Sequence, residues 1–187
     1  GLNQLVLCAG VPWNAADMIR GYLGYVRQLG LRYTPVRIEE ILLAQPELVQ
    51  FLWDYFHARF DPDLSGDRAK AMADAQDNFD TLVRGLRAHD QDVTFRTIFN
   101  LIESTLRTNF YRQDRIEHYI SFKVDCDKIW QMPEPRMKYE VYVHHPEMEG
   151  IHLRGGPIAR GGIRWSDRED YRREVHGLAT TQMVKNV

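Results

Sequence analysis

The sequence predicts an α+β fold, in which a helical N-terminal bundle is followed by a small β-sheet and a C-terminal helix. Apolar residues recur at helical spacing over residues 1–112, whereas the alternation typical of strands begins near residue 113. A stretch rich in glycine and arginine then precedes a last helical pattern. We therefore expect a helical domain at 1–112 and a second domain at 113–187.

The composition is that of an ordinary globular protein, with 44% hydrophobic and 27% charged residues among 187. A net charge of −2 argues against a general nucleic-acid binder. Cys8 and Cys126 lack the spacing of a disulfide framework or a zinc site, so we expect reduced thiols and a cytoplasmic protein. The sequence shows no apolar run of membrane-spanning length and no signal peptide, so no membrane partner is expected.

The N-terminal part is expected to form a series of helices with short connections. Residues 1–30 show helical spacing and end on Gly30, a typical stop signal. Pro35 and Pro46 can each open a helix, because proline is tolerated at the first helical position. Two further helical patterns follow, at 68–87 and 93–110.

Strands are expected at Tyr119–Val124, at Lys138–His144 and from Ile151 to Arg154, where polar and apolar residues alternate. His144 and His145 are possible metal ligands, but neighbouring residues on a strand face opposite ways. No metal site is therefore predicted.

The stretch 154–170 contains four glycines, four arginines and a tryptophan. The glycines predict a loop that a ligand can approach closely, and arginines suit carboxylate or phosphate ligands. Ser166 and Glu169 have the spacing of a capping box, which predicts that a helix begins after Ser166. Neither the P-loop pattern nor the dinucleotide-binding glycine pattern is matched. A simple glycine-rich turn between a strand and a helix is the alternative.

The helical pattern after this loop is expected to place five residues on one face: Tyr171, Val175, Leu178, Gln182 and Lys185. The face begins apolar and should pack inward, whereas Gln182 and Lys185 end it with polar groups. A lysine on such a face needs an anionic partner, unless its side chain extends from the last turn into water.

The run from Gly155 to Val187 closely resembles the substrate-domain signature of the large bacterial NAD-specific glutamate dehydrogenases. Three upstream segments are also similar to this family: Leu106–Phe110, Ile120–Lys123 and Glu149–Arg154. The resemblance covers most of the chain and is weaker before about residue 90. Because the chain begins at Gly1 without methionine and ends at Val187 inside a helical pattern, we expect a piece of a longer polypeptide.

The resemblance implies oxidation of L-glutamate to 2-oxoglutarate and ammonia, with transfer of a hydride to NAD. Arg160 matches the position that holds the substrate's side-chain carboxylate, where most of the wider superfamily has lysine. Gly161 and Gly162 match glycines whose backbone lets the substrate lie close. Gln182 and Lys185 match a pair that holds the α-carboxylate.

In the family, the catalytic lysine, the catalytic aspartate and the NAD-binding domain come later in the sequence than the segment matched here. The resemblance therefore implies that 113–187 is the first part of an incomplete substrate-binding domain, with no catalytic and no cofactor-binding residue. The chain alone is expected to be inactive, and the full-length enzyme to be a homo-oligomer. The alternatives are a non-catalytic anion-binding or regulatory module, and a helical scaffold at 1–112 that mediates oligomerisation.

Overall fold

The computed structural model describes the chain except for 31–32, 115–117, 166–169 and 186–187 and the side chain of residue 185. The described residues form α-helices, a short 3₁₀ helix and a five-stranded antiparallel sheet, which confirms the predicted α+β class. The helices are α1 (Gln4–Cys8), α2 (Trp13–Leu29), α3 (Pro35–Ala44), α4 (Pro46–Phe60), α5 (Arg68–Arg84), α6 (His89–Ser104) and α7 (Tyr171–Lys185). The strands are β1 (Thr105–Thr108), β2 (Ile120–Asp125), β3 (Tyr139–His144), β4 (Glu149–Gly155) and β5 (Ile158–Arg164), and the 3₁₀ helix is η1 (Cys126–Lys128).

The chain packs as two compact units, and α2 and α6 each contribute residues to both. The first unit consists of Gly1–Arg20 and Arg32–Phe99, and the second of Gly21–Leu31 and Asn100–Val187. The sheet unit thus takes in the end of α2 and begins before residue 113. A domain boundary at residue 113 stays a prediction.

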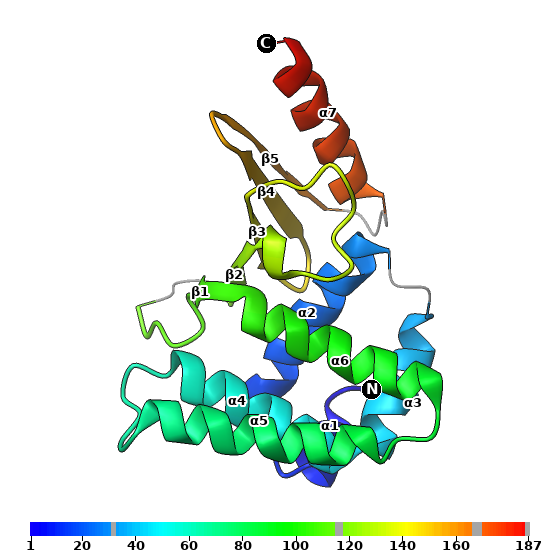
Figure 1. Cartoon of the computed structure of the whole chain (residues 1–187), viewed down its shortest axis with the longest axis vertical. Coiled ribbons are helices and arrows are strands. Elements are labelled where there is room, and N and C mark those ends of the chain that lie inside the picture. Colours follow the sequence, from blue (N-terminus) through cyan, green and yellow to red (C-terminus); the bar gives the residue numbers. More distant parts are fainter. Residues whose placement is uncertain (31–32, 115–117, 166–169, 186–187) are drawn as a thin grey trace. The chain divides into compact units, whose positions relative to one another are not determined.

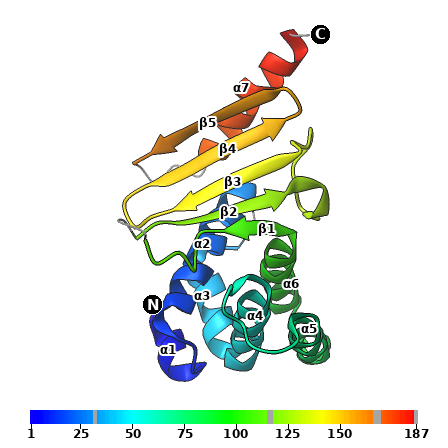
Figure 2. The ribbon, with the colours of Figure 1, turned by 90° about the vertical axis from the view of Figure 1, so that its left-hand side faces the viewer.

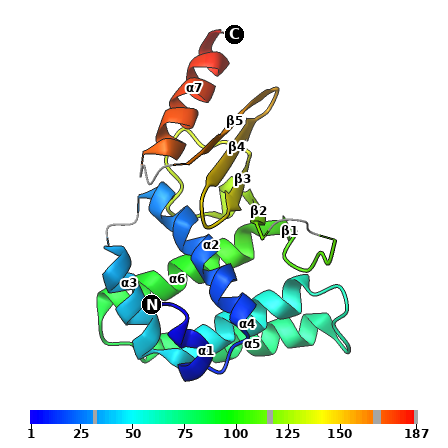
Figure 3. The same ribbon diagram turned by 180° about the vertical axis from the view of Figure 1, so that it is seen from behind.

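The first unit is helical, as expected (Figure 3). Thr34 caps α3 by accepting a hydrogen bond from the backbone N–H of Arg37 at 3.2 Å, and Pro35 takes the first helical position. Asp67 caps α5 in the same way through the N–H of Lys70, at 3.1 Å. Phe79 and Phe99 stack at a ring-centroid distance of 4.3 Å in the core of the unit.

The second unit is built on an antiparallel meander whose strands lie in chain order, β1-β2-β3-β4-β5 (Figure 2). Alternate residues face a buried side, so that Phe122, Tyr142 and Ile151 lie next to one another across three strands. The C-terminal part of α2 and helix α7 pack on this side, α7 against β4 and β5 (Figure 1).

Two glycines allow α2 to approach the sheet closely. A Cβ at Gly21 would lie 2.7 Å from the Phe122 ring, and one at Gly24 would collide with the Tyr142 hydroxyl. Tyr22 stacks on Phe122 at 4.1 Å as a result. The glycines three residues apart on one helix face therefore shape this contact.

Helix α6 ends earlier than the sequence predicted. It stops at Ser104, and the next residues form strand β1, which pairs with β2; Leu106 therefore lies in a strand and not in a helix that runs to Phe110. The Thr105 hydroxyl donates to the Leu101 carbonyl at 2.7 Å and accepts from the Tyr22 hydroxyl at 2.9 Å. The tertiary contact with Tyr22 and the strand pairing override the helical spacing of the apolar residues.

The predicted glycine loop is also shorter than expected. Residues Ile158–Arg164 form strand β5, so the turn is confined to the residues around Gly156, whose φ is +65°. Pairing with β4 along the whole strand supplies the hydrogen bonds that a free loop would lack. The predicted capping box, Ser166 and Glu169, lies outside the described residues.

No helix among the described residues is long and apolar enough to cross a membrane. Both cysteines are free thiols, Cys8 exposed and Cys126 buried. Burial raises the pKa of the Cys126 thiol, which disfavours its reactive thiolate form.

Candidate functional site

Strand β5 turns alternate side chains toward α7. Arg160, Gly162 and Arg164 lie on this side of the strand, opposite Leu153, Ile151 and Glu149 of β4. All three β4 residues are buried. The glycine- and arginine-rich sequence therefore supplies the face of β5 that packs against α7.

Two of the predicted substrate-binding residues meet where β5 contacts α7. The Nε of Arg160 donates to the Oε1 of Gln182 at 2.8 Å, a contact that joins β5 to α7. Among the described residues, no carboxylate forms an ion pair with the exposed Arg160. Lys185 is the last residue of α7, and its side chain lies outside the described part of the structure.

The two predicted glycines have separate surroundings. A Cβ at Gly162 would lie 2.8 Å from the hydroxyl oxygen of Tyr171, so this glycine makes room for the first turn of α7. Gly161 faces the other side of the sheet, where a Cβ would lie 2.8 Å from the Ile151 carbonyl oxygen and 2.9 Å from the His152 ring. Either position is thus closed to a side chain by the protein itself.

The Tyr171 hydroxyl is buried and has no hydrogen-bond partner among the described residues. The guanidinium carbon of Arg164 lies 5.6 Å from the centroid of the same ring. Tyr171 therefore covers both Gly162 and Arg164 where α7 begins.

Arg164 belongs to a buried network centred on Glu149. The Glu149 carboxylate is ion-paired with Arg164 and accepts hydrogen bonds from Tyr142 at 2.6 Å and from Arg27 at 3.0 Å. Burial alone would raise the pKa of Glu149, but these donors and charges outweigh it and hold the pKa below its ordinary value. Burial and the Glu149 carboxylate raise the pKa of Tyr142, so its hydroxyl remains a donor.

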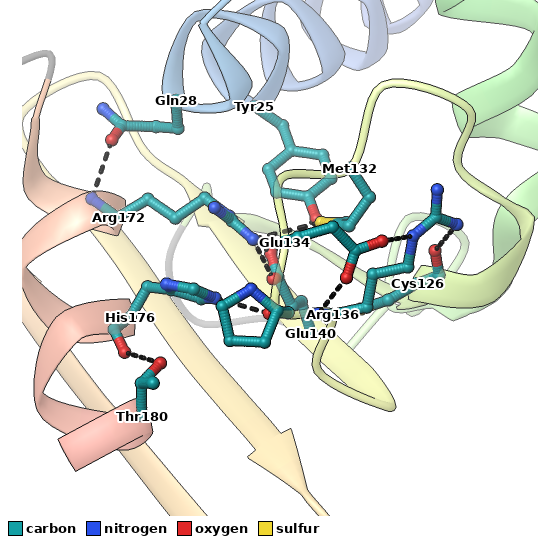
Figure 4. A network of polar contacts seen from close by, with 11 residues as sticks. Tyr25, Gln28, Cys126, Met132, Glu134, Arg136, Glu140, Arg172, His176 and Thr180 are labelled. Atoms are coloured by element: carbon teal, nitrogen blue, oxygen red, sulfur yellow. Dashed lines mark hydrogen bonds and ion pairs between the residues drawn. The ribbon is translucent and has the colours of Figure 1, made fainter.

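A second buried network surrounds Glu140, of which only 1% is exposed (Figure 4). Arg172 of α7 pairs with this carboxylate, and Tyr25 donates to it at 2.7 Å. Burial would lower the pKa of Arg172, but the hydrogen bond and charge of Glu140 outweigh it and raise the pKa. Arg172 also lies 3.0 Å from the Met132 sulfur. This network fixes the first turn of α7 on the sheet.

The buried pair of Arg172 and Glu140 explains why the predicted inward face of α7 is partly wrong. Arg172, Val175 and Ala179 are buried, whereas Leu178 is 58% exposed. The helix is rotated so that the Arg172 guanidinium reaches Glu140, and Leu178 turns away from the sheet.

Sequence reasoning missed the residues of both networks, Arg164 and Arg172 with their glutamates. A signal was present for Glu140, because the alternation in 139–144 puts it on the same strand face as Tyr142. A charged residue on a buried strand face requires a partner of opposite charge.

An open hollow of about 520 Å³ lies beside α7, and its lining includes none of the predicted substrate residues. It is lined by Glu134, Pro135, His176, Gly177, Thr180, Thr181 and Val184. The His176 Nε2 lies 2.7 Å from the Pro135 carbonyl oxygen, so the imidazole is held by the loop before β3 (Figure 4). Over the described ranges, no three side chains of the metal-binding types gather as a metal site would require.

Two protein-family models match the chain in succession. The model described as glutamate dehydrogenase, helical motif 3, matches residues 1–62. The model described as bacterial NAD-glutamate dehydrogenase, catalytic domain, matches residues 78–187, which is more than half of the chain. Strand β5 and helix α7 lie within the second match.

Curated relatives agree with both models. The chain is 40% identical to an NAD-specific glutamate dehydrogenase of Mycobacterium tuberculosis, 39% to one of Pseudomonas aeruginosa and 37% to one of Halomonas elongata. Each alignment covers 98% of this chain, which spans only 12% of the length of each relative.

Proposed function

Because this chain belongs to the bacterial NAD-glutamate dehydrogenase family, we propose that it is part of an NAD-specific glutamate dehydrogenase and supplies part of its glutamate-binding site. The full-length enzyme would oxidise L-glutamate to 2-oxoglutarate and ammonia and pass a hydride to NAD. The observation that carries the proposal is the contact between Arg160 of β5 and Gln182 of α7.

The Arg160–Gln182 contact prepares both side chains for an anion. A guanidinium can only donate, so the Gln182 carbonyl oxygen faces Arg160 and the amide NH₂ is turned toward other acceptors. Arg160 uses its Nε in this contact and keeps the forked edge of the guanidinium for a carboxylate. We assign the substrate's side-chain carboxylate to Arg160 and its α-carboxylate to Gln182 and Lys185.

We include both Gly161 and Gly162 in the proposed site. A side chain at Gly162 would push Tyr171 and the start of α7 off the strand. The proposed role of Gly162 is therefore to let α7, and the substrate beside it, lie close to the β5 backbone. Gly161 faces the other side of the sheet and would contribute through its backbone alone.

NAD is assigned to a part of the enzyme outside this chain, because the sequence has no dinucleotide-binding glycine pattern in its glycine-rich stretch. NAD supplies the hydride acceptor when bound, and the residues described here bind and orient glutamate. We also propose a cytoplasmic homo-oligomer that needs no nucleic acid, membrane or metal.

The test is steady-state kinetics of the full-length enzyme at varied glutamate and varied NAD. Arg160→Met should weaken glutamate use far more than NAD use, because it removes the proposed carboxylate contact and the hydrogen bond to Gln182, neither of which involves NAD. Arg154→Met is the matched control, since Arg154 is also exposed and lies on the other face of the sheet. Native glutamate kinetics in a folded Arg160→Met enzyme would contradict the proposal and favour a non-catalytic anion-binding module.

A further inference from the structure

Gln28 lies in the segment that one family model matches, but its side chain contacts residues in the segment that the other model matches. It belongs to α2, inside the region that matches the helical motif 3 model, residues 1–62. Its side chain is nevertheless 5% exposed and packs within the sheet unit.

The amide of Gln28 uses both of its ends. Its Nε2 donates to the Oε2 of Glu149 at 3.1 Å. Its Oε1 accepts from the backbone N–H of Arg172 at 3.0 Å (Figure 4). One neutral side chain thus joins the two buried networks.

Each of these bonds holds an element of the proposed glutamate site. Glu149 is ion-paired with Arg164 at the end of β5. Arg172 is the second residue of α7, where the backbone N–H has no partner inside the helix, so Gln28 supplies its cap from another helix. Gln28 therefore fixes the start of α7 against the end of β5.

Arg160 and Gln182 lie at the far ends of β5 and α7 from the residues that Gln28 holds. Arg160 is four residues from Arg164, about 13 Å along the strand. Gln182 is ten residues from Arg172, about 15 Å along the helix. A tilt of about 5° where the two elements meet would move the far end of α7 by about 1 Å.

We infer that Gln28 is a positioning residue for glutamate binding, which sets the distance between Arg160 and Gln182 by holding α7 to β5. The inference rests on the proposed function of Arg160 and Gln182 in glutamate binding. It also assigns the end of α2 to the substrate unit, although the family model that covers it describes a helical motif outside the catalytic domain.

Gln28→Met in the full-length enzyme is the main test, because methionine keeps the length of the side chain and removes both hydrogen bonds. Loss of ordinary hydrogen bonds predicts a KM for glutamate raised about 3- to 10-fold, with the KM for NAD unchanged. Gln28→Glu is the second variant. It keeps an acceptor for Arg172 but sets a second carboxylate beside Glu149, and it should also raise the KM for glutamate.

Tyr22→Phe is the matched control for a purely structural effect. Tyr22 is a buried α2 residue whose hydroxyl bonds to Thr105 of β1 at 2.9 Å, at the opposite edge of the sheet from β5. It should reduce thermal stability and leave the KM for glutamate as it is. An equal rise in KM for Tyr22→Phe would show that the effect is general destabilisation and would overturn the inference.

A native KM for glutamate in either folded Gln28 variant would also overturn it. The Arg160→Met enzyme separates this failure from failure of the proposed function. If Arg160→Met impairs glutamate use and the Gln28 variants do not, only the positioning role is wrong. If none of these variants changes glutamate use, the proposed site itself is wrong.

Discussion

The two ends of the β5–α7 pair use arginine in opposite ways. At one end, Arg164 and Arg172 are 7% and 2% exposed, and each is paired with a buried glutamate. At the other end, Arg160 is exposed and bonds to the neutral amide of Gln182. The buried arginines are neutralised within the fold, whereas no carboxylate of the described residues pairs with the exposed one. Arginine density in the sequence therefore does not by itself identify the ligand-binding residue.

Removing a buried arginine should have the largest effect. Arg172→Met would leave Glu140 charged, buried and without its cation, and should destabilise the sheet unit by about 3–5 kcal/mol. Urea unfolding of the purified protein measures this change. Arg173→Met, at the exposed neighbouring position, should change stability by no more than about 0.5 kcal/mol. Similar losses for both variants would mean that burial does not distinguish these arginines.

Removing the basic groups of the proposed site should affect function and leave folding intact. Arg160→Met and Lys185→Met should each lose a charge-assisted contact of about 1.5–3 kcal/mol, which is roughly a 10- to 150-fold fall in kcat/KM for glutamate. Kinetics at varied glutamate and varied NAD measure this fall, and unfolding curves should match those of the native enzyme. A large loss of stability in Arg160→Met would place it with the buried arginines instead.

The close approach of α2 to the sheet can be broken without changing any charge. Gly24→Ala would drive a methyl group into the Tyr142 hydroxyl and to 3.3 Å from the Glu149 Oε1, and should cost about 1–3 kcal/mol. Gly177→Ala is the matched control, because nothing lies within 4 Å of its Cβ position in α7. It should stabilise the protein by about 0.4–1 kcal/mol, as measured by thermal unfolding. An unchanged stability in the Gly24→Ala variant would contradict the observed packing.

Acid should act on the buried end through Glu149. Because the folded state holds the pKa of this carboxyl below its ordinary value of 4.5, the unfolded state binds more protons in the window below that value. The stability contributed by Glu149 is therefore complete above about pH 5 and is lost as the pH falls through the folded pKa. Unfolding free energies measured from pH 6 to 3 should fall less steeply in Glu149→Gln than in the native protein. Glu147→Gln, at an exposed carboxyl two residues before Glu149, should keep the native slope.

Local sequence signals predicted the elements that are stabilised locally. Pro35 and Pro46 begin α3 and α4 as expected, and the alternation over 138–144 is strand β3. Strand β1 was missed because Thr105–Thr108 follows a helix of matching apolar spacing and becomes a strand only by pairing with β2. Strand β5 was taken for a loop, since its glycines and arginines have low strand propensity and its pairing with β4 overrides that propensity.

The sequence by itself determined the α+β class, the family resemblance and the candidate residues from Arg160 to Lys185, because these depend on spacing and residue type along one segment. Only the tertiary structure decided which arginines are buried beside a glutamate and which is exposed. It also brought Gln28 next to Arg172, 144 positions away along the chain. The physical reason is that the partner of a buried charge or amide is set by packing between distant segments, and no local periodicity records it.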